Sequence, residues 1–201
     1  MNSRLEQLLE LEPRRVAVVL VDFQRDFCGP AGTAANTRTA VRANRFAAEA
    51  AELGARVVYT QQTLELSRLT ARQRRWEEDS RMCLPGSPGV ELAVEPVAGA
   101  RVVRKYRFDV WQSPEFLDTL AGWDIDGLVI GGVELQCCVL YAVLGAEERG
   151  YHYVVPQDLV SGIDRCEQTS NRAVRDYLSV AHPAPESAEV VLAGWRQRVG
   201  R

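Results

Sequence analysis

The fold class is decided by the apolar run VAVVLV at residues 16–21, which Asp22 follows directly. Six consecutive strand-forming residues are too few for a buried helix and indicate a strand that is covered on both faces. Strands of this kind belong to parallel sheets that lie between two layers of helices. We therefore expect an α/β fold.

Outward from this run, short apolar stretches alternate with longer helical ones. Further strands are predicted at Arg56–Thr60, Arg101–Lys105, Leu128–Gly131, Tyr153–Pro156 and Glu189–Leu192. Helices are predicted at Asn36–Leu53, about Cys138–Arg149 and Glu167–Ala181, and a glycine follows each of the first two as a stop signal. This alternation predicts a three-layer α-β-α fold with a mainly parallel six-stranded sheet.

Length and composition limit the classes of protein that fit. With 201 residues, 46% of them hydrophobic, the chain suits a single domain over residues 1–201 with one sizeable core. The net charge of −3 gives no basic surface for a nucleic acid or a membrane. Residues 1–15 are charged and lack a long apolar run, so we expect no signal peptide, no transmembrane helix and a cytoplasmic protein.

Cysteine and histidine usage argues against a metal site. The five cysteines are odd in number and have no C-x-x-C spacing, which disfavours both a disulfide framework and a cysteine-bound zinc. The chain has two histidines, His152 and His182, which are too few for a histidine-rich site and which we interpret as structural. We expect neither a metal nor another cofactor.

One segment, Thr63–Pro96, interrupts the alternation and contains no strand-like run. It is an Arg-rich insertion in which Thr70 and Gln73 form a capping box for a short helix. Three interpretations remain open for the part around Arg68–Trp76: a lid, a subunit contact or a solvated surface helix.

Polar residues whose side chains could act in catalysis lie where the predicted strands end. Asp22 ends the first strand and Lys105 the third, and parallel sheets place their active sites beyond the carboxyl ends of the strands. A carboxylate at this rim suits a general base, and a lysine can hold a carboxylate and a thiolate in place. Taken alone, Asp22 is equally a turn cap and Lys105 a solvated strand end.

Cys138 lies where a glycine-rich turn after the fourth strand leads into a helix. The N–H groups and positive partial charge of a helix N-terminus stabilise a thiolate and can form an oxyanion hole. The alternative is a small buried residue that packs the helix on the sheet. Together the three residues place an acid, a base and a nucleophile at one edge of one sheet.

At these residues the chain resembles the isochorismatase-like cysteine hydrolases. The resemblance is carried by VLVDFQRDF at 19–27, KYRFDVWQSPEFL at 105–117 and GVELQCCV at 132–139, and it spans about residues 16 to 178. It implies that Asp22 takes the thiol proton and later activates water, that Cys138 attacks a carbonyl to form a thioester, and that Lys105 stabilises the charged pair. It also implies a cis peptide bond at Val133–Glu134, with N–H groups of this turn and of Cys138 binding the oxyanion.

The chain departs from the family pattern at several positions. Leu135 and Pro114 stand where the family commonly has threonine, and Trp111 where phenylalanine is frequent. The stretch after the second strand, YTQQTL at 59–64, lacks the histidines with which the nicotinamidase branch binds a metal. Phe27, Gln62, Arg107 and Trp111 are predicted to contact the substrate, from their positions alone.

The leading hypothesis is therefore a hydrolase that cleaves a C–N bond of a small amide, a cyclic amide such as a lactam, or a ureide. A first alternative is an isochorismatase-type vinyl-ether hydrolase with Asp22 as the acid, chemistry that needs no thiol. A second is a non-catalytic binding protein on the same fold, which Leu135 and Pro114 favour. The expected partner is a small-molecule substrate, and the resemblance implies a homodimer or larger homo-oligomer.

Overall fold

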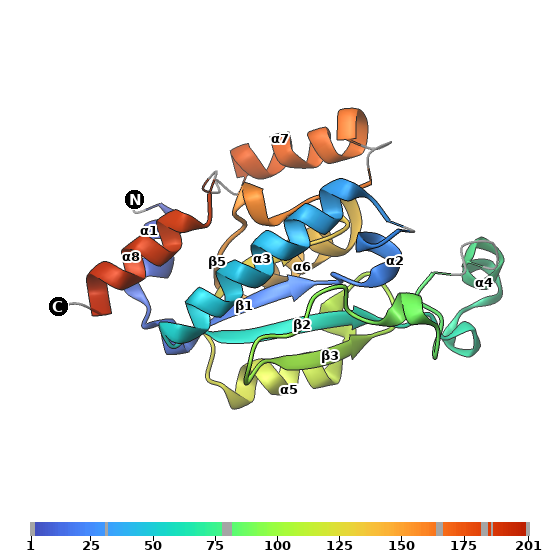
Figure 1. Cartoon of the computed structure of the whole chain (residues 1–201), viewed down its shortest axis with the longest axis horizontal. Coiled ribbons are helices and arrows are strands. Elements are labelled where there is room, and N and C mark those ends of the chain that lie inside the picture. The colour runs from blue at the N-terminus through green and yellow to red at the C-terminus, as the bar shows by residue number, and fades with distance from the viewer. Residues whose placement is uncertain are drawn as a thin grey trace.

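The carboxyl ends of five parallel strands form the edge on which the site is built. The computed structural model describes residues 3–30, 32–77, 82–163, 167–181, 185 and 187–199. The strands are β1 (Val16–Val21), β2 (Arg56–Gln62), β3 (Arg101–Lys105), β4 (Gly127–Gly132) and β5 (His152–Val154). They are arranged in the order β3-β2-β1-β4-β5, and each neighbouring pair is parallel. In Figure 1 the arrowheads of β1, β2 and β3 point towards the side on which α2 and α4 lie.

Helices cover both faces of this sheet. They are α1 (Arg4–Glu10), α2 (Arg25–Cys28), α3 (Ala34–Glu52), α4 (Ala71–Glu77), α5 (Pro114–Gly122), α6 (Leu140–Glu148), α7 (Arg172–Ala181) and α8 (Glu189–Val199). A π-turn at Leu135–Val139 precedes α6, and another at Glu167–Asn171 precedes α7. Short 3₁₀ turns lie at Pro13–Arg15, Leu66–Arg68, Pro88–Val90, Val110–Gln112 and Gln157–Leu159.

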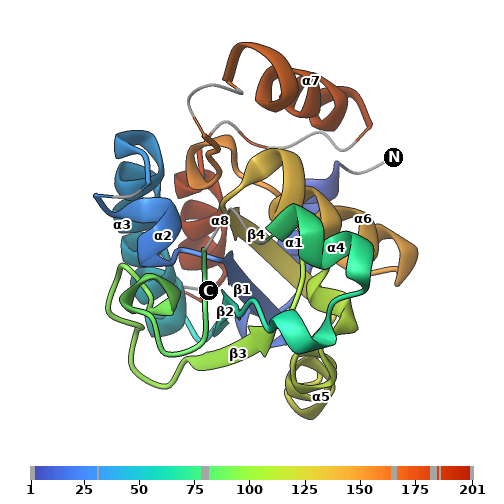
Figure 2. The ribbon, with the colours of Figure 1, turned by 90° about the vertical axis from the view of Figure 1, so that its right-hand side faces the viewer.

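Alternate residues of β1 enter two separate cores. Val16, Val18 and Leu20 pack with α1, α3 and α8, whereas Ala17 and Val19 pack with α5 and α6. Figure 2 shows these two helical layers on opposite sides of the strands. The predicted three-layer α-β-α fold with a parallel sheet is thus confirmed. Among the described residues, no helix combines the length and the apolar character needed to cross a bilayer.

The predicted sixth strand, Glu189–Leu192, is wrong, because these residues begin α8. The sheet has five strands. A short apolar run reads alike in a strand and in a buried helix, and here the 3.6-residue period decides, since Val191, Leu192 and Trp195 are all buried. The helix start is fixed by Asp158, whose carboxylate accepts a hydrogen bond from the Ala188 N–H at 2.9 Å.

The insertion at 63–96 leaves the sheet and returns to the same place. The Leu64 N–H donates to the Cys83 carbonyl at 2.8 Å, and the predicted capping box of Thr70 and Gln73 starts α4. The Asp26 carboxylate accepts from the Cys83 N–H at 2.5 Å, and the Gln24 amide donates to the Val90 carbonyl at 2.7 Å. The return segment is therefore tied to the residues that follow β1.

Candidate active site

Asp22, Lys105 and Cys138 come together from three different strand ends. Asp22 follows β1, Lys105 is the last residue of β3, and Cys138 lies in the π-turn after β4. Because β2 separates β1 from β3, the lysine side chain has to reach across one strand. Its Nζ lies 2.6 Å from Asp22 Oδ2. The long, flexible stem of a lysine is what allows this contact.

The ion pair is buried and surrounded by hydrogen-bond partners. Asp22 is 0% exposed and Lys105 is 1% exposed. Thr60 at the end of β2 donates its hydroxyl to Asp22 Oδ1 at 2.6 Å and accepts from the Asp22 N–H at 3.1 Å. Lys105 Nζ also donates to the carbonyls of Arg107 at 2.9 Å and Phe108 at 3.3 Å. A buried charge pair persists only with such additional partners, and this one has them.

The Lys105 ammonium stays protonated in spite of its burial. Burial acts to lower its pKa, but attraction to Asp22 and to Cys138, with hydrogen bonds to both side chains, raises the pKa above the ordinary lysine value. The site therefore holds one fixed positive charge between a carboxylate and a thiol.

Gln62, predicted as a substrate contact, bridges two members of the trio. Its Oε1 accepts from Lys105 Nζ at 3.3 Å and from Cys138 Sγ at 3.6 Å. The Gln24 side chain fixes Gln62 in turn, since its amide donates to the Gln62 carbonyl and accepts from the Gln62 N–H, both at 2.8 Å. Gln62 thus orients the thiol and the ammonium.

The pKa values of the two adjacent cysteine thiols are shifted in opposite directions. The neighbouring Cys137 thiol and burial raise the pKa of Cys138 well above its usual value, and the nearby Lys105 does not offset the effect. The Cys138 thiol lowers the pKa of Cys137, which is only half-buried. For Cys138 this shift opposes the one that a helix N-terminus favours. Cys138 therefore rests as a neutral thiol that needs a base.

The turn between β4 and α6 keeps some of its N–H groups engaged. The Val133–Glu134 bond is cis, at the position that the family resemblance implies. The N–H groups of Val133 and Leu135 donate to the carbonyls of Val21 and Ser161, each at 2.9 Å. The N–H groups of Cys137 and Val139 both donate to the Glu134 carbonyl. Of the three residues that the family resemblance implies for an oxyanion hole, Val133 therefore donates its N–H to the main chain, and a role for the N–H groups of Glu134 and Cys138 stays a prediction.

Arg107, another predicted substrate contact, lines an open cavity. This cavity, of about 500 Å³, is lined by Arg68, Tyr106, Arg107, Phe108, Asp109 and Tyr141 among others. It lies beside the trio, because the carbonyls of its lining residues Arg107 and Phe108 accept from Lys105 Nζ.

Phe27 and Trp111, also predicted to contact the substrate, are buried in the two cores, and their contact with a substrate stays a prediction. Phe27 packs in the core on the α3 side of the sheet. Trp111 packs edge-on against Phe116, and its indole N–H donates to the Ala142 carbonyl at 3.0 Å.

The departures from the family pattern occupy structural positions. Leu135 is fully buried in the core on the α6 side, and Pro114 is the first residue of α5, where a missing N–H costs nothing. His152 begins β5, at the end of the sheet opposite the trio. His182 and Cys166 lie outside the described residues.

The residues at the end of β2 do not fit a nicotinamidase-type metal site. Gln61 and Gln62 end β2 and Thr63 follows it, and their amide and hydroxyl groups are poor ligands for zinc or iron. Within the described ranges, no group of three histidine, cysteine, aspartate or glutamate residues gathers in a way that could hold a metal ion.

Sequence reasoning missed several residues that support the trio. Thr60 stands at a strand end, so the same rule that selected Asp22 could have given it a role. Gln24 carries no such signal, because its partners lie far away in the sequence. Neither does Asn36, whose side-chain amide donates to Glu134 Oε1 at 2.7 Å.

Solved structures of similar fold come from several hydrolases. The chain superposes on a cysteine hydrolase from Pseudomonas syringae pv. phaseolicola 1448A with a TM-score of 0.81 at 18% identity, covering 93% of this chain and 95% of that one. N-carbamoylsarcosine amidase from Thermoplasma acidophilum gives 0.69 at 23% identity, covering 85% and 94%. The pyrazinamidase of Pyrococcus horikoshii, solved with zinc, gives 0.67 at 22% identity, covering 81% and 95%.

At these identities the superpositions show the shared fold. Comparison with curated proteins gives no match. The sequence profile of the isochorismatase domain, however, matches residues 16–182, which include all three residues of the buried trio. This match covers most of the chain, and the chain therefore belongs to the isochorismatase family.

Proposed function

We propose that the protein is a cysteine hydrolase that cleaves a C–N bond of a small amide, a cyclic amide such as a lactam, or a ureide through a thioester. One observation carries this proposal: a buried lysine ammonium binds the carboxylate of Asp22 at 2.6 Å, and the same Gln62 oxygen accepts hydrogen bonds from this ammonium and from the thiol of Cys138. A nucleophile, a base and a fixed positive charge in one dry site are what acyl transfer requires.

In the first step Cys138 attacks the substrate carbonyl carbon and gives its thiol proton to Asp22. The raised pKa of the Cys138 thiol makes this base necessary. The Lys105 ammonium stabilises the negative charge as it moves from carboxylate to sulfur. The substrate oxygen becomes an oxyanion, which the N–H groups of Glu134 and Cys138 bind. When the intermediate collapses, the C–N bond breaks and the leaving nitrogen takes the proton from the carboxylic acid of Asp22.

In the second step water hydrolyses the thioester. Asp22, again a carboxylate, takes a proton from the attacking water, the hydroxide adds to the thioester carbonyl, and the C–S bond breaks. The Cys138 sulfur regains a proton from the protonated Asp22, and a carboxylic acid leaves. Each proton that Asp22 accepts is returned, so the site is restored after one turnover.

The cavity beside the trio suits a small molecule. Its volume of about 500 Å³ lies in the range of ordinary ligand sites. Tyr106, Phe108 and Tyr141 supply flat apolar walls, and Arg68 and Arg107 supply N–H donors. These groups favour a substrate with both an apolar portion and a hydrogen-bond acceptor.

The decisive experiment is intact-mass spectrometry of the protein after incubation with a panel of linear amides, lactams and ureides. We expect an acyl adduct on Cys138 with at least one member and none in Cys138→Ala. Activity that survives complete chelation would agree with a reaction carried by the chain's own residues. Activity that is lost on chelation and restored by zinc, iron or manganese would contradict the proposal.

The same variant separates the alternatives. Vinyl-ether hydrolysis of the isochorismatase type would survive Cys138→Ala, because it uses Asp22 as an acid and no thiol. A non-catalytic binding protein would form no adduct with any electrophilic substrate. The buried thiol held by Lys105 and Gln62 favours the cysteine mechanism over both.

A further inference from the structure

Glu134, the residue before the π-turn that carries Cys138, has a buried and tightly held carboxylate. The side chain is 8% exposed. Its Oε1 accepts from Asn36 Nδ2 at 2.7 Å, and its Oε2 accepts from the Ile163 N–H at 2.5 Å. The donors come from α3 and from the segment after β5, two parts of the chain far from Glu134 in sequence. A buried carboxylate is costly without such donors.

Asn36 is fully engaged as the centre of this network. It is 0% exposed. Its Oδ1 accepts from the Ser161 hydroxyl at 2.6 Å, and its Nδ2 donates to the Phe27 carbonyl at 3.0 Å as well as to Glu134. The amide therefore has one orientation, and it links α2, the Ser161 segment and the turn after β4.

Ser161 reaches the same turn through its main chain. Its N–H donates to the Gly132 carbonyl at 3.2 Å, and its carbonyl accepts from the Leu135 N–H at 2.9 Å. The residues on either side of the Val133–Glu134 pair are thus held by the main chain of Ser161, while its hydroxyl orients Asn36.

The main chain of Glu134 connects this network to the nucleophile. The Glu134 carbonyl accepts from the Cys137 N–H at 3.0 Å and from the Val139 N–H at 3.2 Å, so it fixes the residues on both sides of Cys138. The Glu134 N–H is itself one of the two candidate oxyanion donors. Fixing the Glu134 side chain therefore fixes the donor and the turn together.

We propose that Asn36, oriented by Ser161, is a positioning residue for acyl transfer: it holds Glu134 so that the N–H groups of Glu134 and Cys138 face the substrate oxyanion. The inference rests on the proposed function only in that Cys138 must be acylated. In this proposal Asn36 of α3 and Ser161 affect the rate of catalysis, although they contact neither the thiol nor the base.

Two probes of Cys138 separate this role from a purely structural one. 4-Nitrophenyl acetate acylates a thiolate through an oxyanion and releases 4-nitrophenolate. Iodoacetamide alkylates the same thiolate at a saturated carbon and releases iodide, with no oxyanion. The variants are made in a Cys137→Ser background, so that peptide mass spectrometry reports on Cys138 alone. Asn36→Ala should slow acylation by roughly 10- to 100-fold, the effect of a displaced donor, and leave alkylation within about 2-fold.

Thr37→Ala is the matched control. Thr37 follows Asn36 in α3 and donates its hydroxyl to the Cys28 carbonyl at 2.8 Å, as Asn36 donates to the Phe27 carbonyl. Neither of its recorded hydrogen bonds involves Glu134. Both probes should react with this variant at the parent rate, even if its melting temperature falls.

Donor and acceptor can also be exchanged across the contact. Asn36→Asp places two carboxylates together, and Glu134→Gln places two amide donors together, so each should slow acylation. The double variant pairs an amide at 134 with a carboxylate at 36 and should recover part of the lost rate. A purely steric role for Asn36 predicts no such recovery.

Each outcome bears on the inference. The inference is supported if Asn36→Ala slows acylation but not alkylation, and if Thr37→Ala slows neither. If Asn36→Ala fails to fold, Ser161→Ala is tested in the same way. Equal slowing of both probes, or normal acylation in a folded Asn36→Ala, overturns it alone. If 4-nitrophenyl acetate never acylates Cys138 in the parent protein, the proposed function falls, and this inference falls with it.

Discussion

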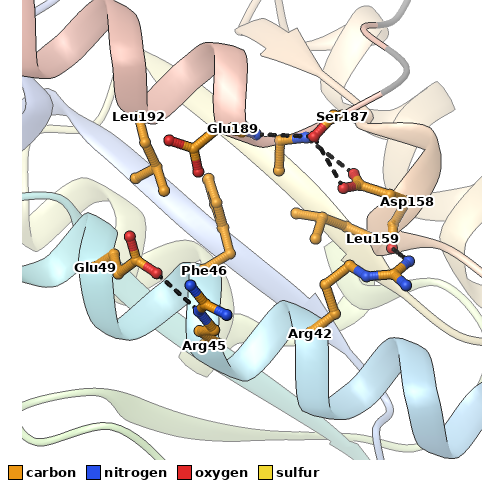
Figure 3. A pocket seen from close by; sticks show the side chains of 10 residues that line it. Arg42, Arg45, Phe46, Glu49, Asp158, Leu159, Ser187, Glu189 and Leu192 are labelled. Carbon is orange, nitrogen blue, oxygen red and sulfur yellow. Dashed lines mark hydrogen bonds and ion pairs between the residues drawn. The ribbon is translucent and has the colours of Figure 1, made fainter.

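The ion pair at the strand ends is buried, whereas the ion pairs at the charged cavity between α3 and α8 are exposed. The cavity has a volume of about 220 Å³, and Figure 3 shows arginines from α3 facing Glu189 and Leu192 of α8. Arg196 pairs there with Glu49 at 2.6 Å and with Glu189 at 2.7 Å, but its side chain is 46% exposed. Asp22 and Lys105 are almost completely excluded from solvent.

Exposure to solvent decides how strongly each of these charges interacts with its partner. In the α3–α8 cavity, water screens each pair, and the first N–H groups of α8 are already bound by Asp158 and Ser187. At the strand ends, the low dielectric strengthens the electrostatic attraction of the Lys105 ammonium to the Asp22 carboxylate and to the nearby Cys138 thiol. The larger effects of substitution should therefore lie at the strand ends.

The largest expected effect is that of Cys138→Ser. It should abolish amide hydrolysis, because a serine hydroxyl at this position is far less acidic than a thiol. Cys137→Ser should keep most of the activity, since the Gln62 and Lys105 contacts belong to Cys138. The measurement is turnover of an amide identified by the adduct screen. Equal losses in the two variants would show that the nucleophile is misassigned.

Asp22→Asn should lower kcat by roughly 10²- to 10⁴-fold, the usual share of a general base. Asp22 has a positive φ of 55°, a conformation that asparagine also tolerates, so the fold should persist. Steady-state kinetics with circular dichroism as the control check this expectation. A folded variant with a near-normal rate would rule out Asp22 as the base.

Lys105→Ala should destabilise the protein by about 3–5 kcal/mol, because it leaves the Asp22 charge buried without its partner. Urea denaturation measures this loss. Adding Asp22→Ala to the variant should restore part of the stability by removing the uncompensated charge. If the double variant were less stable than Lys105→Ala, the cost would come from lost packing instead.

The thiol pair predicts an order of labelling with pH. The lowered pKa of Cys137 means that its thiolate forms at lower pH, whereas the raised pKa of Cys138 delays its thiolate to higher pH. Iodoacetamide should therefore label Cys137 first as the pH is raised, the reverse of the order that a helix N-terminus alone would give. Fragment-ion mass spectrometry distinguishes the neighbours, and earlier labelling of Cys138 would show that its thiolate forms at lower pH than that of Cys137.

The smallest effect is expected at Arg196. Arg196→Ala removes two exposed ion pairs, and the melting temperature should fall by no more than about 2–4 °C with catalytic rate unchanged. Differential scanning calorimetry gives the shift. If Arg196→Ala lost as much stability as Lys105→Ala, exposure would not explain the difference between the two regions.

The strands and the trio could be predicted because each depends on local sequence and one topological rule. The run at 16–21 is apolar without interruption, and parallel strands bring Asp22 and Lys105 to one edge. The sixth strand failed because four residues, Glu189–Leu192, are too few to show a period, and the buried Trp195 that reveals the helix lies beyond them. Helix α1, whose capping box at Ser3 and Glu6 is a readable signal, was passed over.

The supporting network could not be predicted, since no local pattern encodes it. Asn36, Glu134 and Ser161 look like an ordinary helix residue, a surface acid and a loop serine. Their relation exists only after the chain has folded, because 98 residues separate Asn36 from Glu134 and 125 separate it from Ser161. Ring direction is equally hidden, so the sequence could not show that Phe27 and Trp111 are buried in the two cores.

The hydrogen bond between the Leu64 N–H and the Cys83 carbonyl has a consequence for substitutions and length changes in this part of the chain. It joins Leu64 and Cys83, the two ends of a connecting segment that we call the cassette. A change in the length of the cassette should alter the free energy of loop closure only slightly, by about 0.6 kcal/mol for each doubling of its length. Arg68 and Gln73 within the cassette line the cavity beside the trio. A substitution at Arg68 or Gln73 should therefore change the lining of the cavity without changing any residue of the trio.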